Sequence, residues 1–167
     1  MPAGHAAETL TERQVWEWLA DVPDPEIPVV SVIDLGMIRA VSVRGNRVEV
    51  SVSPTYSGCP ATEVIEHSIV AELRRRGVEC ASVRRVLSPP WSSDWISDEG
   101  RTKLRRYGIA PPAGGSKREL LEGLRPVQCP RCGGAQTTLV SEFGSTACKA
   151  SYKCSDCLEP FEYFKCI

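Results

Sequence analysis

The sequence contains little histidine, and this scarcity limits the chemistry that it can support. Its two histidines are His5, near the N-terminus, and His67, within a predicted helix. A hydrolase that activates a cysteine or serine needs a nearby base, and histidine is the usual one. We therefore expect neither histidine to act as a base and disfavour hydrolase chemistry based on a cysteine–histidine pair.

An excess of charge and a long apolar run are also missing. The 20 basic and 21 acidic residues give a formal net charge of -1, which offers no general attraction to nucleic acid or to an anionic membrane. The N-terminal residues lack the basic and apolar segments of a secretory signal, and no stretch is long enough to span a bilayer. We expect a cytoplasmic protein, in which the eight cysteines are metal ligands, reactive thiols or small buried residues rather than disulfides.

Local patterns predict a helix and then a hairpin in the first fifty residues. The helix is expected to begin at Thr9 or Thr11, because Thr11 and Gln14 can form a capping box before apolar residues at helical spacing. Alternating valines predict strands at 38–43 and 48–52, joined by a turn that contains glycine.

Further along, a second helix is predicted to start with Pro60 as its first residue and to end in a basic turn before a glycine. A strand at 81–87 and a short helix at 98–107 follow. These elements predict an α+β fold, with a small mixed sheet covered by helices and followed by a β ribbon. The expected domains are residues 1–110, a linker at 111–126, and a ribbon at 127–167.

Four cysteines near the C-terminus have the spacing of a zinc ribbon. Two C-x2-C pairs, Cys129 with Cys132 and Cys154 with Cys157, flank strand-like segments that turn at Gly144. A hairpin would bring the two pairs together as four sulfur ligands, and so small a unit has too little core to fold without a metal. Zinc is the expected ion, although four thiolates can also hold iron.

Two more cysteines in this region, Cys148 and Cys166, have two interpretations. Each is a small apolar residue on a strand, or the two form a second thiol pair that handles iron, sulfide or a disulfide near the ribbon. The sequence leaves both open.

One cysteine stands apart in the N-terminal half. Cys59 precedes Pro60, so it lies at or near a helix N-terminus, where unpaired N–H groups stabilise a thiolate. It is either a metal ligand or nucleophile, or a cysteine tolerated in a crowded turn. The nearby carboxylates Asp24, Glu26 and Asp34 are suited to stabilise proline-rich turns, and they could instead supply oxygen ligands close to Cys59.

Several short motifs together resemble a known family. DPEIP at 24–28, DLG at 34–36, T-x-x-x-C-P at 55–60, and SPPW with DW at 88–95 are similar to the SufT-like domain of iron–sulfur cluster assembly factors. The C-terminal segments CPRCG, FGSTACK and FKC extend the resemblance to the PaaD branch, also called PaaJ, whose members are accessory proteins of phenylacetyl-CoA epoxidase. The resemblance covers nearly the whole chain.

The resemblance implies a function without catalysis. It implies delivery or insertion of iron–sulfur clusters during maturation of the oxygenase that epoxidises phenylacetyl-CoA in aerobic phenylacetate breakdown. The expected partners are epoxidase subunits, above all the iron–sulfur reductase, and a second copy of the chain with which a transient cluster would be shared. The family's reactive cysteine falls on Cys59, its acidic and threonine positions on Asp24, Glu26, Asp34 and Thr55, and its ribbon ligands on the two C-x2-C pairs.

Two alternatives remain from other classes of function. The chain could be a zinc-containing docking or structural subunit of the oxygenase that never carries a cluster. It could also be a thiol–disulfide oxidoreductase that uses Cys59, or Cys148 with Cys166. Against the oxidoreductase, Cys59 lacks a C-x-x-C partner, and both C-x-x-C pairs fit a ribbon better.

Overall fold

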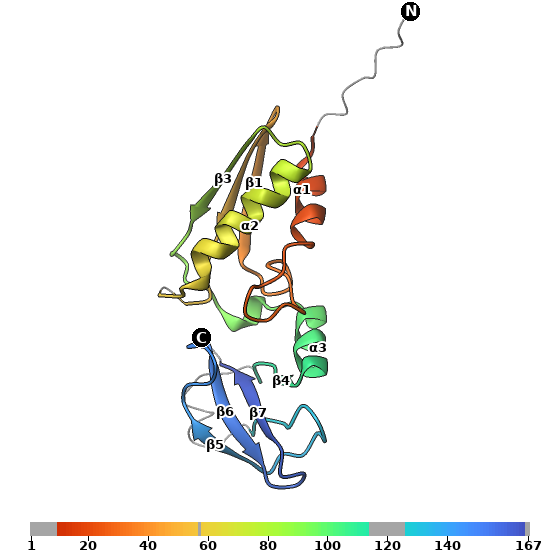
Figure 1. Ribbon diagram of the computed structural model, residues 1–167, viewed down its shortest axis with the longest axis vertical. Coiled ribbons are helices and arrows are strands. Elements are labelled where there is room, and N and C mark those ends of the chain that lie inside the picture. The colour runs from red at the N-terminus through yellow and green to blue at the C-terminus, as the bar shows by residue number, and fades with distance from the viewer. Residues whose placement is uncertain (1–9, 57, 114–125, 166–167) are drawn as a thin grey trace, which may run out of the picture.

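The computed structural model describes residues 10–56, 58–113 and 126–165, which form two sheets with helices around the first (Figure 1). The element order is α1 (Glu12–Leu19), β1 (Ile38–Arg44), β2 (Arg47–Val52), α2 (Ala61–Arg75), β3 (Cys80–Arg85), the 3-10 helix η1 (Ser93–Trp95), α3 (Asp98–Tyr107), β4 (Ile109–Ala110), β5 (Thr137–Ser141), β6 (Lys149–Cys154) and β7 (Pro160–Phe164). The predicted α+β class is confirmed. Within the described residues, no helix combines the length and apolar character needed to cross a bilayer.

The N-terminal sheet has three strands in the order β1-β2-β3. The predicted hairpin pairs β1 with β2 in antiparallel fashion, and α2 then carries the chain across so that β3 lies parallel to β2. Figure 1 shows α1 and α2 over the same face of this sheet. The sheet is therefore mixed and covered by helices, as the sequence predicts.

Helix boundaries follow the local signals closely. The Thr11 side chain accepts a hydrogen bond from the Gln14 N–H at 3.3 Å, and the Gln14 side chain accepts one from the Thr11 N–H at 2.9 Å. This is the predicted capping box, and it starts α1 at Glu12. At the other end of this unit, α3 stops at Gly108, whose φ of 94° suits glycine.

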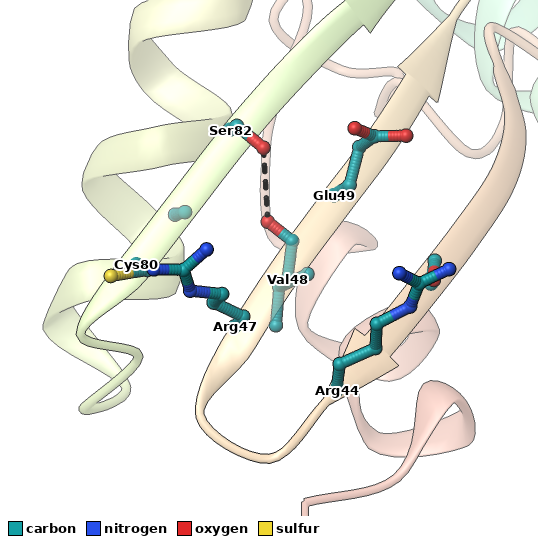
Figure 2. A pocket seen from close by; sticks show the side chains of 8 residues that line it. Arg44, Arg47, Val48, Glu49, Cys80 and Ser82 are labelled. Carbon is teal, nitrogen blue, oxygen red and sulfur yellow. Dashed lines mark hydrogen bonds between the residues drawn. The ribbon is translucent and has the colours of Figure 1, made fainter.

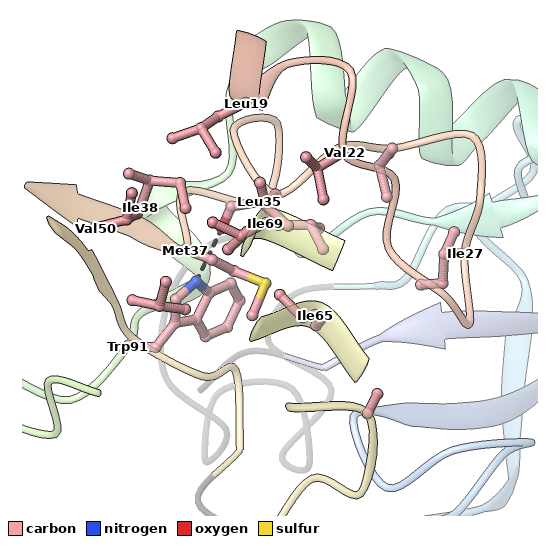
Figure 3. Close-up of a cluster of buried hydrophobic side chains, with 14 of the residues drawn as sticks. Leu19, Val22, Ile27, Leu35, Met37, Ile38, Val50, Ile65, Ile69 and Trp91 are labelled. Atoms are coloured by element: carbon pink, nitrogen blue, oxygen red, sulfur yellow. Dashed lines mark hydrogen bonds between the residues drawn. The ribbon is translucent and has the colours of Figure 1, made fainter. Parts of the chain in front are cut away.

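The main core lies between the covering helices and the N-terminal sheet (Figure 3). The i+4 series of α2 supplies Ile65 and Ile69, and both are buried as its spacing predicts. Trp91 of the SPPW segment is also buried, and its indole Nε1–H donates to the Leu35 carbonyl at 2.8 Å. This bond attaches the segment after β3 to the loop after α1, which contains the DLG motif.

The C-terminal sheet has four strands in the order β4-β7-β6-β5. The predicted hairpin corresponds to β5 and β6, whereas β7 and β4 were not predicted from the sequence. The short strand β4 pairs in parallel with β7, so this sheet already includes Ile109 and Ala110. These two residues precede the predicted linker, and the exact domain limits stay a prediction.

The two units are packed against each other through Phe164. This last residue of β7 is 1% exposed and belongs to the N-terminal core, where its ring centroid lies 5.9 Å from that of Trp91. Arg101 of α3 adds a hydrogen bond of 2.7 Å to the Pro112 carbonyl, next to β4. Figure 1 shows that α2 begins at the end of its unit that faces the C-terminal sheet.

Candidate metal centres

Four cysteines come together at one end of the C-terminal sheet. Their sulfur atoms all lie within 4.8 Å of one another, with Cys129 3.7 Å from Cys157 and Cys132 3.6 Å from Cys154. A tetrahedral ion with bonds of about 2.3 Å to sulfur requires sulfur–sulfur edges of about 3.8 Å. The geometry of this four-thiol cluster therefore fits a zinc ion.

Backbone N–H groups of the first knuckle favour the thiolate form. Burial raises the pKa of the Cys129 thiol, but N–H donors at Cys132 and Arg131, together with hydrogen bonds from the thiols of Cys132 and Cys157, outweigh it and bring the pKa to about 7. The knuckle closes through hydrogen bonds of 2.9 Å from the Cys129 N–H to the Gly134 carbonyl and from the Gly133 N–H to the Cys129 carbonyl. A short loop thus holds two sulfurs in place with their charge partly compensated.

Cys59 lies two residues before the first residue of α2, with the N-cap Pro60 between them, close to where the sequence places it. Pro60 has helical dihedral angles of -65° and -23°, although the regular helix starts one residue later, at Ala61. The Cys59 N–H donates to the Tyr56 carbonyl at 3.1 Å, and its carbonyl accepts the Thr62 N–H at 3.2 Å. The thiol is half-buried and packs against the N-terminal core.

Two neighbouring hollows surround the Cys59 side chain. One is an enclosed space of about 10 Å³, enough for a single water or ion, and its lining includes Asp24 and Thr55. The other is an open hollow of about 270 Å³, lined in part by residues 145–148. Three residues line both hollows, namely Glu26, Cys59 and Cys148. We call these three the junction site.

The structure thus brings Cys148 to Cys59, a neighbour that the sequence did not suggest. Cys148 precedes β6 but packs, like Cys59, against the N-terminal core. The two residues are far apart in the chain, so no local spacing could have revealed them as neighbours. The proposed partner Cys166 lies outside the described residues, as does His5. His67 is exposed on α2, as expected for a surface residue.

Asp24 and Glu26 stand in a turn built by Asp24 itself. The Asp24 Oδ1 accepts the N–H groups of Glu26 at 2.9 Å and Ile27 at 2.8 Å. Burial raises the pKa of Asp24, although these N–H donors oppose the shift. Burial also raises the pKa of Glu26, and the neighbouring Asp24 adds to the effect. Asp24 therefore fixes the backbone that presents Glu26 to the hollows.

Asp34 has a different position from the other two carboxylates. Its Oδ2 accepts the Ser31 N–H at 2.9 Å and pairs with the Lys103 ammonium at 2.9 Å. It lines neither of the two hollows beside Cys59. The following Gly36 has a φ of 63° and packs so closely on Trp95 that a side chain would collide with it. The DLG motif thus joins the loop to α3 and η1.

A further hollow, of about 470 Å³, lies on the strands of the N-terminal sheet. It is lined by Arg44, Arg47, Cys80 and Ser82 among others, and the Ser82 hydroxyl donates to the Val48 carbonyl at 3.5 Å (Figure 2). None of the predicted site residues lines it. Cys80 is exposed there and supplies a control thiol remote from the junction site.

Comparison with known proteins identifies both units. Residues 12–86 match the model of an iron–sulfur cluster assembly protein family, and residues 113–165 match the PaaD zinc beta ribbon domain. A relative from Escherichia coli (strain K12), whose name describes it as a subunit of 1,2-phenylacetyl-CoA epoxidase, is 49% identical over 155 residues, which are 93% of each chain. This chain belongs to the PaaD family. The resemblance drawn from the sequence motifs is confirmed.

Solved structures resemble the N-terminal unit of this PaaD-family protein. A domain of unknown function, DUF59, from Bacillus anthracis is 27% identical with a TM-score of 0.52, covering 56% of this chain and 90% of that one. A conserved hypothetical protein from Thermotoga maritima is 25% identical with a TM-score of 0.51, covering 59% of this chain and 97% of that one. These likenesses agree with the α+β fold described above.

Proposed function

We propose that this protein is an iron–sulfur cluster assembly or insertion factor that matures a phenylacetyl-CoA epoxidase and is not itself an enzyme. The match of residues 12–86 to an iron–sulfur cluster assembly family supports the first part. The name of the relative from Escherichia coli, an epoxidase subunit, supports the client. The cargo is iron or a cluster, which the protein holds transiently and releases.

The position of Cys59 carries this proposal. A half-buried thiol at the start of α2, beside a space for one ion and an open hollow, is placed to bind a metal that must later leave. Thr55 and Asp24 line the enclosed space and provide polar surroundings for the ion. Asp34 is assigned a supporting function through the loop that it anchors.

The four-thiol cluster has a separate function in the proposal. Cys129, Cys132, Cys154 and Cys157 would hold zinc as a permanent structural ion, because a closed set of four thiolates binds tightly and leaves no open position. The ribbon would dock on the client, with the reductase component as the proposed contact. We further propose that the protein acts in the cytoplasm, and that two chains pair so that their two Cys59 thiolates share the cluster.

Anaerobic reconstitution with ferrous iron and sulfide tests this function. Wild type and Cys59→Ser are compared for iron, sulfide and zinc content, and then for their ability to restore activity to epoxidase produced without this protein. We expect both proteins to retain zinc, and only wild type to bind iron and sulfide and to mature the epoxidase.

The alternatives predict different results from the same experiment. If both proteins bind only zinc and mature the epoxidase equally, the cluster-carrier function is wrong, and the docking-subunit interpretation replaces it. If wild type cycles between a thiol and a disulfide form and this cycle, rather than iron, restores the epoxidase, the oxidoreductase interpretation replaces it.

A further inference from the structure

We propose that Cys148 is the second sulfur ligand of the cargo iron, so that Cys59, Cys148 and Glu26 form one labile site between the two units of a single chain. This inference rests on the cluster-carrier part of the proposed function, and it takes the second thiol from the same chain in place of the Cys59 thiolate of a partner copy. It also gives the C-terminal unit a direct part in holding the cargo.

The convergence of three candidate ligands carries the inference. Glu26 comes from the loop after α1, Cys59 from the start of α2, and Cys148 from the turn before β6, yet all three line both hollows. Two thiolates and a carboxylate form a donor set that suits ferrous iron. The open hollow of about 270 Å³ gives the ion access from solvent and leaves room for sulfide or a client ligand.

The turn that carries Cys148 is firmly built. The Gly144 N–H donates to the Lys149 carbonyl at 2.8 Å, and the Ser145 N–H donates to the Glu162 carboxylate at 2.6 Å. The Cys148 carbonyl accepts the Lys165 N–H at 2.9 Å, which ties it to the end of β7. These bonds, together with Phe164 in the N-terminal core, fix Cys148 at the junction. A ligand held this way loses little freedom when it binds a metal.

The surroundings of Cys148 favour the neutral thiol until a metal ion binds. Lys149 is only 3% exposed and pairs with Glu162 at 2.9 Å, so a positive charge is buried next to the thiol. Burial raises the pKa of Cys148, and the charges of Glu26 and Cys59 add to the rise, while the Thr146 hydroxyl, 3.1 Å from the sulfur, and Lys149 oppose it. Without metal this residue stays a thiol, and a bound cation would displace its proton.

The incomplete donor set explains release. The four-thiol cluster surrounds its ion completely, whereas three donors beside an open hollow leave a coordination position for a ligand from the client. Transfer would then be a ligand exchange with no change in oxidation state.

Matched serine variants test the inference. Cys148→Ser, Cys59→Ser and the remote control Cys80→Ser are titrated anaerobically with ferrous iron, and zinc content and far-UV circular dichroism report on folding. We expect Cys148→Ser and Cys59→Ser each to weaken iron binding by more than about tenfold, because losing a ligand costs at least as much as losing its supporting hydrogen bond. Cys80→Ser should bind like wild type.

The outcomes separate this inference from the function on which it rests. If Cys59→Ser loses iron while Cys148→Ser keeps it, the assignment of Cys148 as the second ligand is wrong, and the proposed function as a cluster carrier is unaffected. If the loaded form is always a dimer with one iron site per two chains and Cys148→Ser keeps its iron, the shared Cys59 site replaces the junction site. If wild type binds no iron, both proposals are wrong.

A second measurement needs no substitution and so does not depend on the folding of a variant. Dibromobimane bridges two neighbouring thiols, and peptide mass spectrometry identifies the pair. In zinc-loaded, iron-free wild type we expect an intrachain bridge between Cys59 and Cys148, and ferrous iron should protect against it. A bridge that never joins these two residues contradicts the junction site.

Discussion

The two units of this protein differ in what holds them together. The N-terminal core contains buried side chains from α1, α2, α3 and the strands β1 and β2, whereas β3 contributes only partly buried ones. The buried side chains are almost entirely aliphatic. The separate cluster of the C-terminal sheet is small, and two of its buried members are the metal-ligating cysteines Cys129 and Cys154. Burial of apolar surface therefore stabilises one unit, whereas we expect the other to depend on a metal ion held by its four thiols.

This difference also separates two uses of cysteine. In the four-thiol cluster, closely spaced thiols form a closed set of ligands, for which we propose a structural ion. At the junction site, thiols from two units meet beside an open hollow, where an ion bound as proposed would stay accessible. The following predictions test how far the two units are independent.

Removing the metal should have the largest effect. A strong chelator at neutral pH, or Cys154→Ser, should unfold the C-terminal sheet, since binding of a structural zinc supplies on the order of 10 kcal/mol. Limited proteolysis should then cut after residue 126 while α1 to α3 stay protected. Cys80→Ser is the control and should resist cleavage. A C-terminal sheet that stays protected without metal would refute the contrast between the units.

Phe164→Ala should break the junction rather than either unit. This buried ring packs on Trp91, and its loss should lower the free energy of unfolding by about 3–5 kcal/mol. Phe143→Ala is the control, because that ring is 65% exposed and should cost little. Chemical denaturation measures both, and zinc content should stay unchanged. Equal costs for the two variants would show that Phe164 does not join the units.

Asp34→Asn should weaken the N-terminal unit by about 1–3 kcal/mol at neutral pH, since it removes a charged partner from Lys103 and Ser31. Burial raises the pKa of Asp34, but hydrogen bonds from Ser31 and Lys103 lower it by more than burial raises it, so the net shift of the pKa is downward. A carboxyl with a depressed pKa in the folded state stabilises above its unfolded value of about 3.9 and loses this effect as pH falls through its folded value.

The free energy of unfolding, measured as a function of pH, tests whether the stabilisation by Asp34 is lost as pH falls. Wild type and Asp34→Asn should differ at pH 7 and converge below about pH 4. Glu99→Gln is the control, since its ion pair with the same lysine is 73% exposed on the glutamate side. A difference that persists unchanged at low pH would contradict the assignment to this carboxylate.

The smallest expected effect concerns the cap of α1. Thr11→Ala removes the side-chain acceptor of the capping box and should cost about 1 kcal/mol of N-terminal stability. Thr11→Ser keeps the hydroxyl and should behave like wild type. Neither change should alter the stability of the C-terminal unit. Zinc release during chemical denaturation reports the unfolding of that unit and can measure this.

Most local elements could be predicted because their signals lie within a few residues. The capping box at Thr11, the i+4 series of α2 and the stop at Gly108 each involve contacts between near neighbours. Strands β7 and β4 could not be predicted in the same way. Ile109 and Ala110 become a strand only because β7, some fifty residues later, offers them hydrogen-bond partners.

The candidate sites differ in the same way, because one follows from local patterns and the other from contacts between distant residues. The sequence alone determined the four-thiol cluster, because each C-x2-C pair is a local turn that presents two sulfurs whatever surrounds it. It also marked Cys59 as a thiol before a helix. Only the tertiary structure placed Cys148 beside it, through the way Phe164 and β4 join the two units. It also placed Asp34 apart from Cys59, where it pairs with Lys103 of α3. Such packing depends on the burial of apolar side chains that are far apart in the chain, and the spacing of residues in the sequence does not predict it.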